Sequence, residues 1–447
     1  MSHIKIKKGH DIKISGLPEA NIALAPAASV LALLPSDFKG VKPKLMVKIG
    51  DNVKIGSPIF FDKLNPDVKW ASPGSGVIKD IKYGPRRVIE KIEIELDKSQ
   101  ESIDFKSHSM DDISNLSKSE VLEAILEANL FPHFRQRPFN TIPDHKIVPR
   151  DIFISGLNTA PLAVDLEIAM TDELENFQAG INAIGKLTDG NVYLTNKVNS
   201  RLSNIKNVKI NTIEGPHPSG NVSIQVHHIS HLKPAEFIWT INPQDVIMLG
   251  KFFTNGIYDP SKIISVAGPC VKDPTHLRIK TGYPLEPLLK ANLLSDDVRM
   301  ISGDVLTGRE CSLNDYISFY DSSVSVISNE IKREFIGMLN PGSSFSRYSL
   351  TPVFLSLSKM LFPFTSSQNG NHRSVVPINS WERVLPMDIL PNELYRSIIA
   401  EDVEEMESLG LFECDDEDFA LCSFACPSKT DVSGVIRRGL DILQAEV

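Results

Sequence analysis

The strand–helix–strand alternation between residues 151 and 195 constrains the fold of this chain most strongly. A short apolar run, Asp151–Ser155, is followed by a helical repeat of apolar residues and then by a second apolar run, Asn191–Thr195. The repeat comprises Leu174, Phe177, Ile181, Ile184 and Leu187. Alternation at this spacing is typical of parallel strands joined by a crossover helix. The sequence therefore predicts an α/β layer in the middle of the chain.

The loop after the first of these strands lacks the features of a nucleotide site. A dinucleotide-binding fold needs several glycines there, so that backbone amides can approach a pyrophosphate. The loop reads Ser155-Gly156-Leu157-Asn158-Thr159-Ala160-Pro161 and contains one glycine, and no complete P-loop motif occurs in the chain. We therefore expect a Rossmann-like layer that serves as a scaffold.

Residues 47–81 carry the turn pattern of a lipoyl or biotin carrier domain. The pattern consists of Gly50-Asp51, the pair Asp62-Lys63 and the turn Ser72–Val77. In carrier domains such a lysine bears a swinging cofactor arm at a tight hairpin tip. Here residues 64–67 lengthen the tip, Phe61 precedes the pair, and the Met-Lys-Met of biotin carriers is absent. The sequence predicts a carrier-like fold in which Lys63 is unmodified.

The pattern changes at several other points of this 447-residue chain, which is too long for one ordinary core. Residues 1–105 are rich in strand signals, and residues 98–119 have the composition of a polar linker. Ser117 and Glu120 form a capping-box pair that opens a helix. The middle region then extends over residues 106–257.

Two short strands follow, Lys262–Ala267 and Val298–Ile301, with a helix start near Tyr283 between them. This order suits a small β-grasp module over residues 258–330. The remaining residues, 331–447, favour helices and are acidic. Their charge runs at 401–407 and 413–418 are expected to form a solvated face, as such runs usually do.

Composition excludes several classes of protein. The net charge of −9 argues against a nucleic-acid partner, because phosphate contacts need a basic face. The most apolar segment, residues 22–34, is shorter than the ~20 residues of a membrane-spanning helix, and we expect a packed surface loop there. Five sparse cysteines indicate a reducing cytoplasm, and Cys422 and Cys426 lack the spacing of an iron–sulfur site. They are expected to be buried free thiols.

Histidines gather between residues 215 and 231. His217 lies between two prolines in Gly215–Gly220, and His227, His228 and His231 follow. We expect His227 and His228 to alternate on a strand and so to point to opposite faces. With no cysteine nearby, a metal site is not expected there. A rigid loop at a partner or ligand surface is the favoured interpretation.

Many short motifs, in order, resemble one family along nearly the whole chain. They are IKKG (6–9), VKIGDNV (47–53), GPHPSG (215–220), DVIMLGKFF (245–253), AGP (267–269), RMISGDVLTG (299–308), SVVPINSWERVLPMDILP (374–391) and LGLFECDDEDFALCSFACPSK (409–429). Together they are similar to the NqrA family, the A subunits of the sodium-translocating NADH:quinone reductases.

This resemblance implies a fold and a role. The fold is a mixed α/β and α+β multidomain one: a barrel-sandwich hybrid at 1–105, a Rossmann-like domain at 106–257, a β-grasp (SLBB-like) module at 258–330 and a C-terminal helical domain at 331–447. The role is that of a peripheral subunit on the cytoplasmic side of the bacterial inner membrane, docked on membrane subunits. The resemblance implies no catalytic residue and no cofactor in this chain, since NADH, flavins and iron–sulfur clusters are handled by other subunits.

Two alternatives are left open by the sequence. One is the cluster-bearing C-type subunit of an Rnf-type electron-transport complex, which would need tandem C-x₂-C-x₂-C motifs that this sequence lacks. The other is a lipoyl-carrier fusion, which a modified Lys63 would reveal.

The resemblance also associates the chain with the reduction of ubiquinone. A quinone site is an apolar cleft with a few hydrogen-bond donors. The candidate donors are His217, with His227 or His228 on the adjacent strand, and Trp239 and Phe253 could form an apolar wall.

Overall fold

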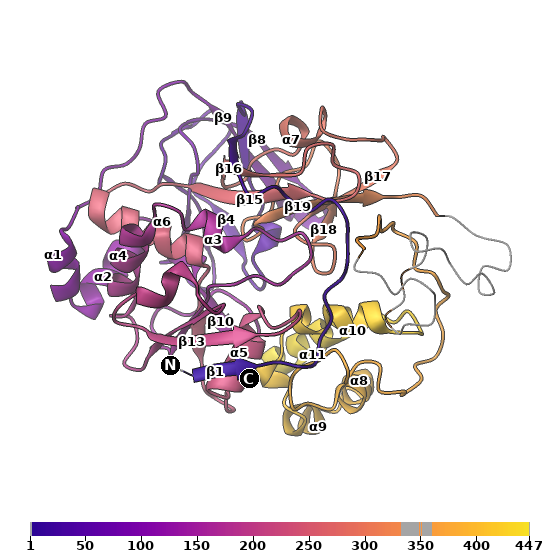
Figure 1. Ribbon diagram of the computed structural model, residues 1–447. Coiled ribbons are helices and arrows are strands. Elements are labelled where there is room, and N and C mark those ends of the chain that lie inside the picture. Colours follow the sequence, from indigo (N-terminus) through magenta and orange to yellow (C-terminus); the bar gives the residue numbers. More distant parts are fainter. Residues whose placement is uncertain (1, 332–347, 349, 351–359, 447) are drawn as a thin grey trace.

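The computed structural model describes every residue except 1, 332–347, 349, 351–359 and 447. Four β-sheets form its first three quarters, and a group of helices follows them in sequence (Figure 1). No helix in the described ranges is both long and apolar enough to cross a membrane. The fold is of the mixed α/β class and contains several sheets.

The middle of the chain forms the α/β layer with parallel strands that the alternation predicted, as part of a six-stranded sheet. Its strand order is β1 (Ser2–Lys5), β13 (Lys209–Glu214), β12 (Val192–Asn196), β11 (Ile152–Ser155), β14 (Ile238–Thr240) and β10 (Arg135–Arg137). All neighbouring pairs are parallel except β10 with β14. The associated helices are α1 (Met110–Asn115), α2 (Lys118–Glu127), α3 (Leu166–Ala169), α4 (Leu174–Ile184), α5 (Val222–Ile229) and α6 (Pro243–Asn255).

Helices α4 and α6 approach each other closely because glycines stand at their crossing. A Cβ atom on Gly250 of α6 would lie 1.8 Å from the carbonyl oxygen of Asn176 in α4. A Cβ atom on Gly180 would lie 2.1 Å from the carbonyl oxygen of Val246. Any larger side chain at either position would push the two helices apart.

Two smaller sheets form the first part of the chain. One has the order β3 (Val30–Leu33), β9 (Ile89–Leu96), β8 (Gly76–Tyr83) and β5 (Asn52–Val53); the other has the order β4 (Pro43–Leu45), β6 (Pro58–Asp62) and β7 (Lys69–Ala71). The two sheets share a core, in which Phe60 and Trp70 stack with 4.5 Å between their ring centroids. Residues 2–5 do not belong to these two sheets, because they form β1, which pairs with β13 of the α/β sheet.

The third region forms another six-stranded sheet. Its order is β18 (Arg309–Cys311), β17 (Val298–Ser302), β19 (Ser323–Ser328), β15 (Ser261–Ala267), β16 (Thr275–Lys280) and β2 (Ile22–Leu24), with α7 (Glu286–Leu289) between β16 and β17 in sequence. The predicted strands at 262–267 and 298–301 and the helix between them are confirmed.

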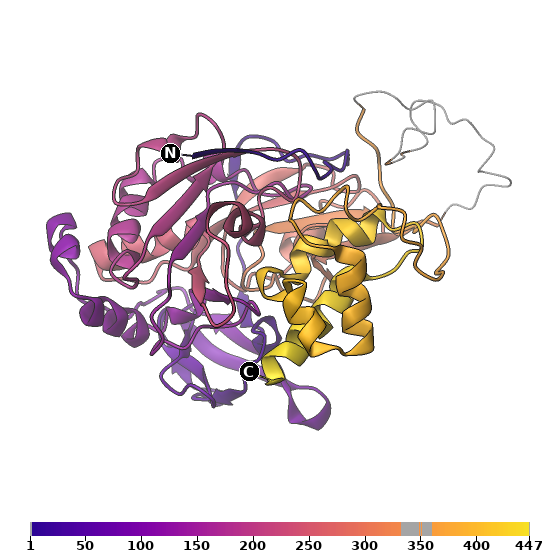
Figure 2. The same cartoon turned by 90° about the horizontal axis from the view of Figure 1, so that it is seen from below.

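The C-terminal helices gather on one side of the α/β sheet (Figures 1 and 2). They are α8 (Pro391–Ala400), α9 (Val403–Ser408), α10 (Ala420–Ala425) and α11 (Val432–Glu446). Ile213 of β13 and Ile224 of α5 belong to the same buried cluster as Trp381 and Leu440. The C-terminal region and the α/β region therefore share one apolar core. The start expected at 331 adjoins residues that lie outside the described ranges.

Two expectations about local structure are wrong. Residues 22–34 are not a surface loop, since they contain β2 and β3, which pair with β16 and β9. The linker expected at 98–119 contains α1, whose N-cap Ser109 forms a capping box with Asp112 and whose Ile113 is fully buried. The capping box of Ser117 and Glu120 at the start of α2 is confirmed.

A buried ion pair joins the α/β region to the C-terminal region. Arg137, 3% exposed, contacts Asp415, 1% exposed, with 2.9 Å between Nη2 and Oδ2. The same Nη2 lies 2.9 Å from Oε1 of Glu417, and the Asn140 amide donates to Asp415 at 2.7 Å. The prediction that run 413–418 is a solvated face is therefore wrong for Asp415 and Asp418, which are buried, while the other three carboxylates are partly exposed.

The pKa values in this run differ between neighbours. Burial would raise the pKa of Asp415, but the charges of Arg137, Lys39 and Arg437 hold it below its ordinary value. Burial, with the charges of Glu417 and Asp415, raises the pKa of Asp418 to about 8. Asp415 is therefore the anion that compensates Arg137.

Replacing Arg137 by alanine should strongly destabilise the protein, because Asp415 and Glu417 would lose their buried cation. Removing one partner of a buried pair costs about 3–5 kcal/mol in the free energy of unfolding, which urea denaturation measures. The control is Lys54→Ala, which removes an exposed ion pair with Glu101 and should change stability little. Equal effects of the two variants would contradict this assignment.

Candidate functional site

The histidine-bearing loop 215–220 lies at the carboxyl end of β13, beside the loop that follows β11. His217 is 3% exposed. Its backbone N–H donates to Asp11 at 2.9 Å, and its carbonyl accepts from the backbone N–H of His10 at 2.8 Å. Gly9 permits this contact, since a Cβ atom there would lie 2.3 Å from the His217 carbonyl oxygen. The loop is therefore fixed from both sides, as its prolines suggested.

The His217 ring has one partner and one free nitrogen among the described residues. Nδ1 lies 3.2 Å from the hydroxyl of Thr159, which also accepts from the N–H of Gly220 at 2.9 Å. Nε2 is buried and has no hydrogen-bond partner within those ranges. Burial lowers the pKa of His217 to about 4, so the ring is neutral at pH 7.

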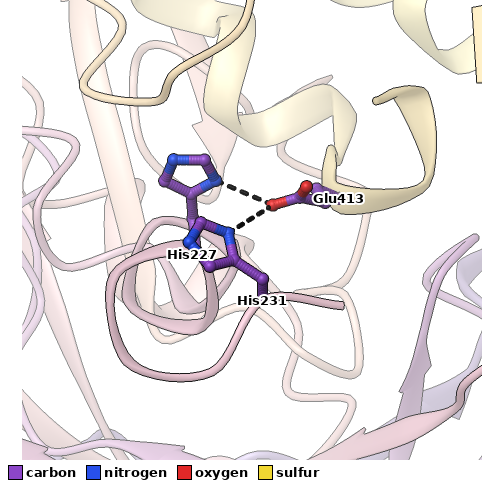
Figure 3. A group of neighbouring side chains, drawn as sticks. All are labelled: His227, His231 and Glu413. Carbon is purple, nitrogen blue, oxygen red and sulfur yellow. Dashed lines mark hydrogen bonds and ion pairs between the residues drawn. The ribbon is translucent and has the colours of Figure 1, made fainter. Parts of the chain in front are cut away.

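His227, near the end of α5, points toward Glu413 together with His231 (Figure 3) and contacts two C-terminal segments. Its Nε2 accepts a hydrogen bond from the backbone N–H of Asp388 at 3.0 Å. A backbone N–H can only donate, so the proton of the neutral ring lies on Nδ1. Nδ1 then donates to the carboxylate of Glu413 at 2.7 Å. This neutral histidine uses both nitrogens to hold the C-terminal region.

The neighbouring histidines strengthen the same junction. Nε2 of His228 lies 2.8 Å from the carbonyl oxygen of Pro386, to which it must donate. His231, whose side chain is 62% exposed, places Nδ1 3.3 Å from Glu413. Burial would raise the pKa of Glu413, but the hydrogen bonds from His227 and His231 lower it.

The expectation that His227 and His228 alternate on a strand is wrong, because they lie on helix α5. The segment Val222–Ile229 has strand-like β-branched residues at several positions, yet tertiary packing selects a helix. Sequence reasoning also missed Glu413, which lies 186 residues from His227. In the sequence, Glu413 stood out only as part of the acidic run 413–418, and that run predicted a solvent-exposed face.

His227, His231 and Glu413 bring three possible metal ligands within 4.8 Å of one another. The hydrogen bonds argue against a metal. A metal at Nδ1 of His227 would displace its proton, and the ring would then need a proton on Nε2, where the N–H of Asp388 already donates. Metal binding would break that bond. The group fits a hydrogen-bonded junction better than a ligand set.

The other predicted site residues lie apart from these histidines. Trp239, 2% exposed, packs on Phe131 and Phe134 at 5.4 and 5.5 Å between ring centroids. Phe253, 1% exposed, packs on Phe252 at 5.1 Å. Both belong to the main core, where they could not line a cleft without repacking.

The hairpin that bears Lys63 has a tip of several residues. Lys63 is exposed just after β6, and its backbone N–H donates to the carbonyl of Lys42 at 2.9 Å. Because β6 ends at Asp62 and β7 begins at Lys69, residues 63–68 form a long tip between the two strands.

The five cysteines are buried, as expected, and unpaired. Burial raises the pKa of Cys414 and Cys422, which keeps both thiols protonated at pH 7.

Three family models match the chain. The NqrA N-terminal barrel-sandwich hybrid domain matches residues 4–97, the NqrA second alpha/beta domain matches 116–258, and the NQRA C-terminal domain matches 263–312. The first match agrees with the two small sheets of the first region.

Curated relatives match over almost their whole length. The A subunit of the Na(+)-translocating NADH-quinone reductase of Hahella chejuensis (strain KCTC 2396) is 36% identical, over 99% of this chain and 100% of that protein. The protein of the same name from Pasteurella multocida (strain Pm70) is also 36% identical, with the same coverage. Among solved structures, an air-oxidized NAD+-reducing [NiFe]-hydrogenase aligns at a TM-score of 0.39 and 12% identity, over 78% of this chain and 69% of that one. A likeness of that level supports no inference.

Replacing His227 by alanine should loosen the junction between α5 and the C-terminal region. The variant leaves the N–H of Asp388 without its partner, and Glu413 keeps only the contact with the exposed His231 at 3.3 Å. A lost buried hydrogen bond of about 1.4 kcal/mol corresponds to roughly tenfold faster hydrogen exchange at residues 386–389 and 411–414. Mass spectrometry of deuterium uptake measures this.

The control for that experiment is His3→Ala, which removes an exposed ring on β1. It should leave deuterium uptake at both segments unchanged. If His227→Ala also leaves it unchanged, the histidine does not hold these segments.

Proposed function

The chain belongs to the NqrA family, and on that premise we propose that it is the NqrA subunit of a sodium-translocating NADH:quinone reductase. The observation that carries this proposal is 36% identity over 99% of the chain to curated subunits of that kind. The complex named by those relatives oxidises NADH, reduces a quinone and transports sodium, and this chain would contribute to it as one subunit. No observation favours the cluster-bearing Rnf protein.

Within such a complex the chain acts as a scaffold without redox chemistry. The loop after β11 has a single glycine, and the space beside it is occupied, since a Cβ atom on Gly156 would lie 2.2 Å from Oδ1 of Asn196. This supports a Rossmann-like domain without a nucleotide, beside a carrier-like domain with unmodified Lys63 and a β-grasp module. Flavins and iron–sulfur clusters belong to other subunits in this proposal.

In this proposal the chain sits on the cytoplasmic side of the membrane and docks on the membrane subunits of the complex. The family resemblance supports this peripheral position. The many polar contacts between the α/β and C-terminal regions support a rigid body that can position partners.

Contact with ubiquinone is proposed for the loop around His217. The free Nε2 supports this, because in the tautomer that accepts the Thr159 proton on Nδ1 it would carry a hydrogen that has no acceptor in the described ranges. His227 and His228 are committed to the C-terminal region, and Trp239 and Phe253 to the core. His217 is therefore the member of the expected set best suited to this contact.

The proposed role predicts that the complex depends on this chain. Membranes containing the other subunits alone should show no sodium-stimulated NADH:quinone reductase activity, and coexpression of the chain should restore it. Co-purification with the membrane subunits provides the second readout. Full activity without the chain, or failure to co-purify, would contradict the proposal.

The quinone contact predicts a specific kinetic change. His217→Ala in the assembled complex should raise the apparent KM for quinone roughly fivefold, the effect of losing about 1 kcal/mol. The KM for NADH should stay unchanged. His3→Ala serves as the control. An unchanged quinone KM in a fully assembled complex would remove His217 from the site.

A further inference from the structure

The hairpin between β8 and β9 ends in an exposed, basic tip. Residues 82, 83 and 85–88 are all exposed, and Tyr83 and Val88 are 53% and 59% exposed. Below the tip, Ile81 and Ile89 are buried, at 7% and 8% exposure, and anchor the hairpin in the core. The exposed apolar and aromatic groups are therefore confined to the end of a firmly held element.

The tip is a fixed turn and not a loose loop. The N–H of Gly84 donates to the carbonyl of Val88 at 2.8 Å, and the N–H of Arg87 donates to the carbonyl of Gly84 at 3.2 Å. Arg86 and Arg87 both have left-handed backbones, with φ of 56° and 60°. Two arginines thus stand next to each other at the turn, between Tyr83 and Val88.

The two arginine charges of the tip are not neutralised within the described ranges. Neither Arg86 nor Arg87 forms an ion pair there, whereas Lys82 contacts Glu90 at 3.1 Å. Lys91, directly opposite Lys82 across the hairpin, contacts Glu93 at 2.6 Å, so the free positive charge of the tip is that of the two arginines. A free guanidinium pair beside an exposed tyrosine suits phosphate oxygens, which arginine binds through two parallel hydrogen bonds.

The distribution of charge along the chain also favours contact between the first region and an anionic surface. Residues 1–100 contain 17 Lys and Arg against 11 Asp and Glu, whereas the rest of the chain contains 30 against 45. The first region is therefore positive in a chain whose net charge is −9. A negative surface would attract this region and repel the remainder.

We propose that the tip formed by residues 82–88 contacts the anionic phospholipid headgroups of the membrane, with Arg86 and Arg87 on phosphates and Tyr83 and Val88 at the headgroup level. This proposal rests on the proposed function only because it assumes that the complex lies in a membrane. Tyrosine and arginine are suited to this interface, since each combines an apolar body with a polar end. The contact orients the protein, and its protein partners hold it.

A lipid surface fits the tip better than a protein partner does. A stable protein interface buries about 800 Å² on each partner, over some 20–30 residues. The tip offers seven residues on a narrow turn. Lipid contact needs no such area, because each basic residue near an anionic surface adds its own attraction.

The test is co-sedimentation of the purified full-length chain with vesicles. Vesicles of phosphatidylcholine with phosphatidylglycerol should bind it, vesicles of phosphatidylcholine alone should not, and binding should fall as salt rises. Arg86→Glu with Arg87→Glu should weaken binding at least tenfold. Arg86→Gln with Arg87→Gln removes the charge without reversing it and should weaken binding less.

The matched control is Lys206→Glu with Lys233→Glu, two exposed lysines of the α/β region with no ion pair in the described ranges. It makes the same change in net charge and should leave vesicle binding nearly unchanged. Equal loss in both double variants, or no binding of the unaltered chain to anionic vesicles, would overturn the proposal. So would an arginine variant that binds vesicles normally but no longer assembles with the membrane subunits, since the tip's partner would then be a protein.

Discussion

The buried contact between Arg137 and Asp415 is the interaction on which the arrangement of this chain depends. Removing two charges from water is costly, and the cost is offset only where geometry and further hydrogen bonds are good. Here Asn140 also donates to Asp415, while the Arg137 Nε donates to Ser223 at 3.2 Å. A cation at the end of β10 thus meets an anion from the far end of the sequence. The pair therefore joins the C-terminal region to the α/β region inside the protein.

The histidines of α5 act on the same boundary and explain why the two regions behave as one body. His227 donates to Glu413 and accepts from the amide of Asp388, so it fixes two C-terminal segments at once. Apolar residues from both regions fill the core beneath them. A protein that must present several partners to one another gains from such rigidity.

What the sequence predicted correctly was local or followed from spacing. The parallel pair β11 and β12 follows from its alternation, and the capping box at Ser117 needs only residues three apart. The family resemblance identified the chain's relatives. What the sequence missed depends on distant partners. The helix around His227 is selected by packing against the C-terminal region, and Asp415 in the acidic run at 413–418 is buried because Arg137 compensates its charge. The local pattern does not reveal these distant partners. It predicted a strand around His227 and a solvent-exposed face at 413–418.

A double-mutant cycle between Arg137 and Asp415 tests this account most directly. Arg137→Met would leave Asp415 with only the more distant Lys39 and Arg437, and Asp415→Leu would leave Arg137 with Glu417 alone. The double variant removes both members of the closest pair and keeps apolar volume. The account predicts that the double variant is more stable than the sum of the single effects implies, with a coupling of at least about 1 kcal/mol in urea-induced unfolding. Additive effects would show that the two residues contribute independently and that the C-terminal region is held by other contacts.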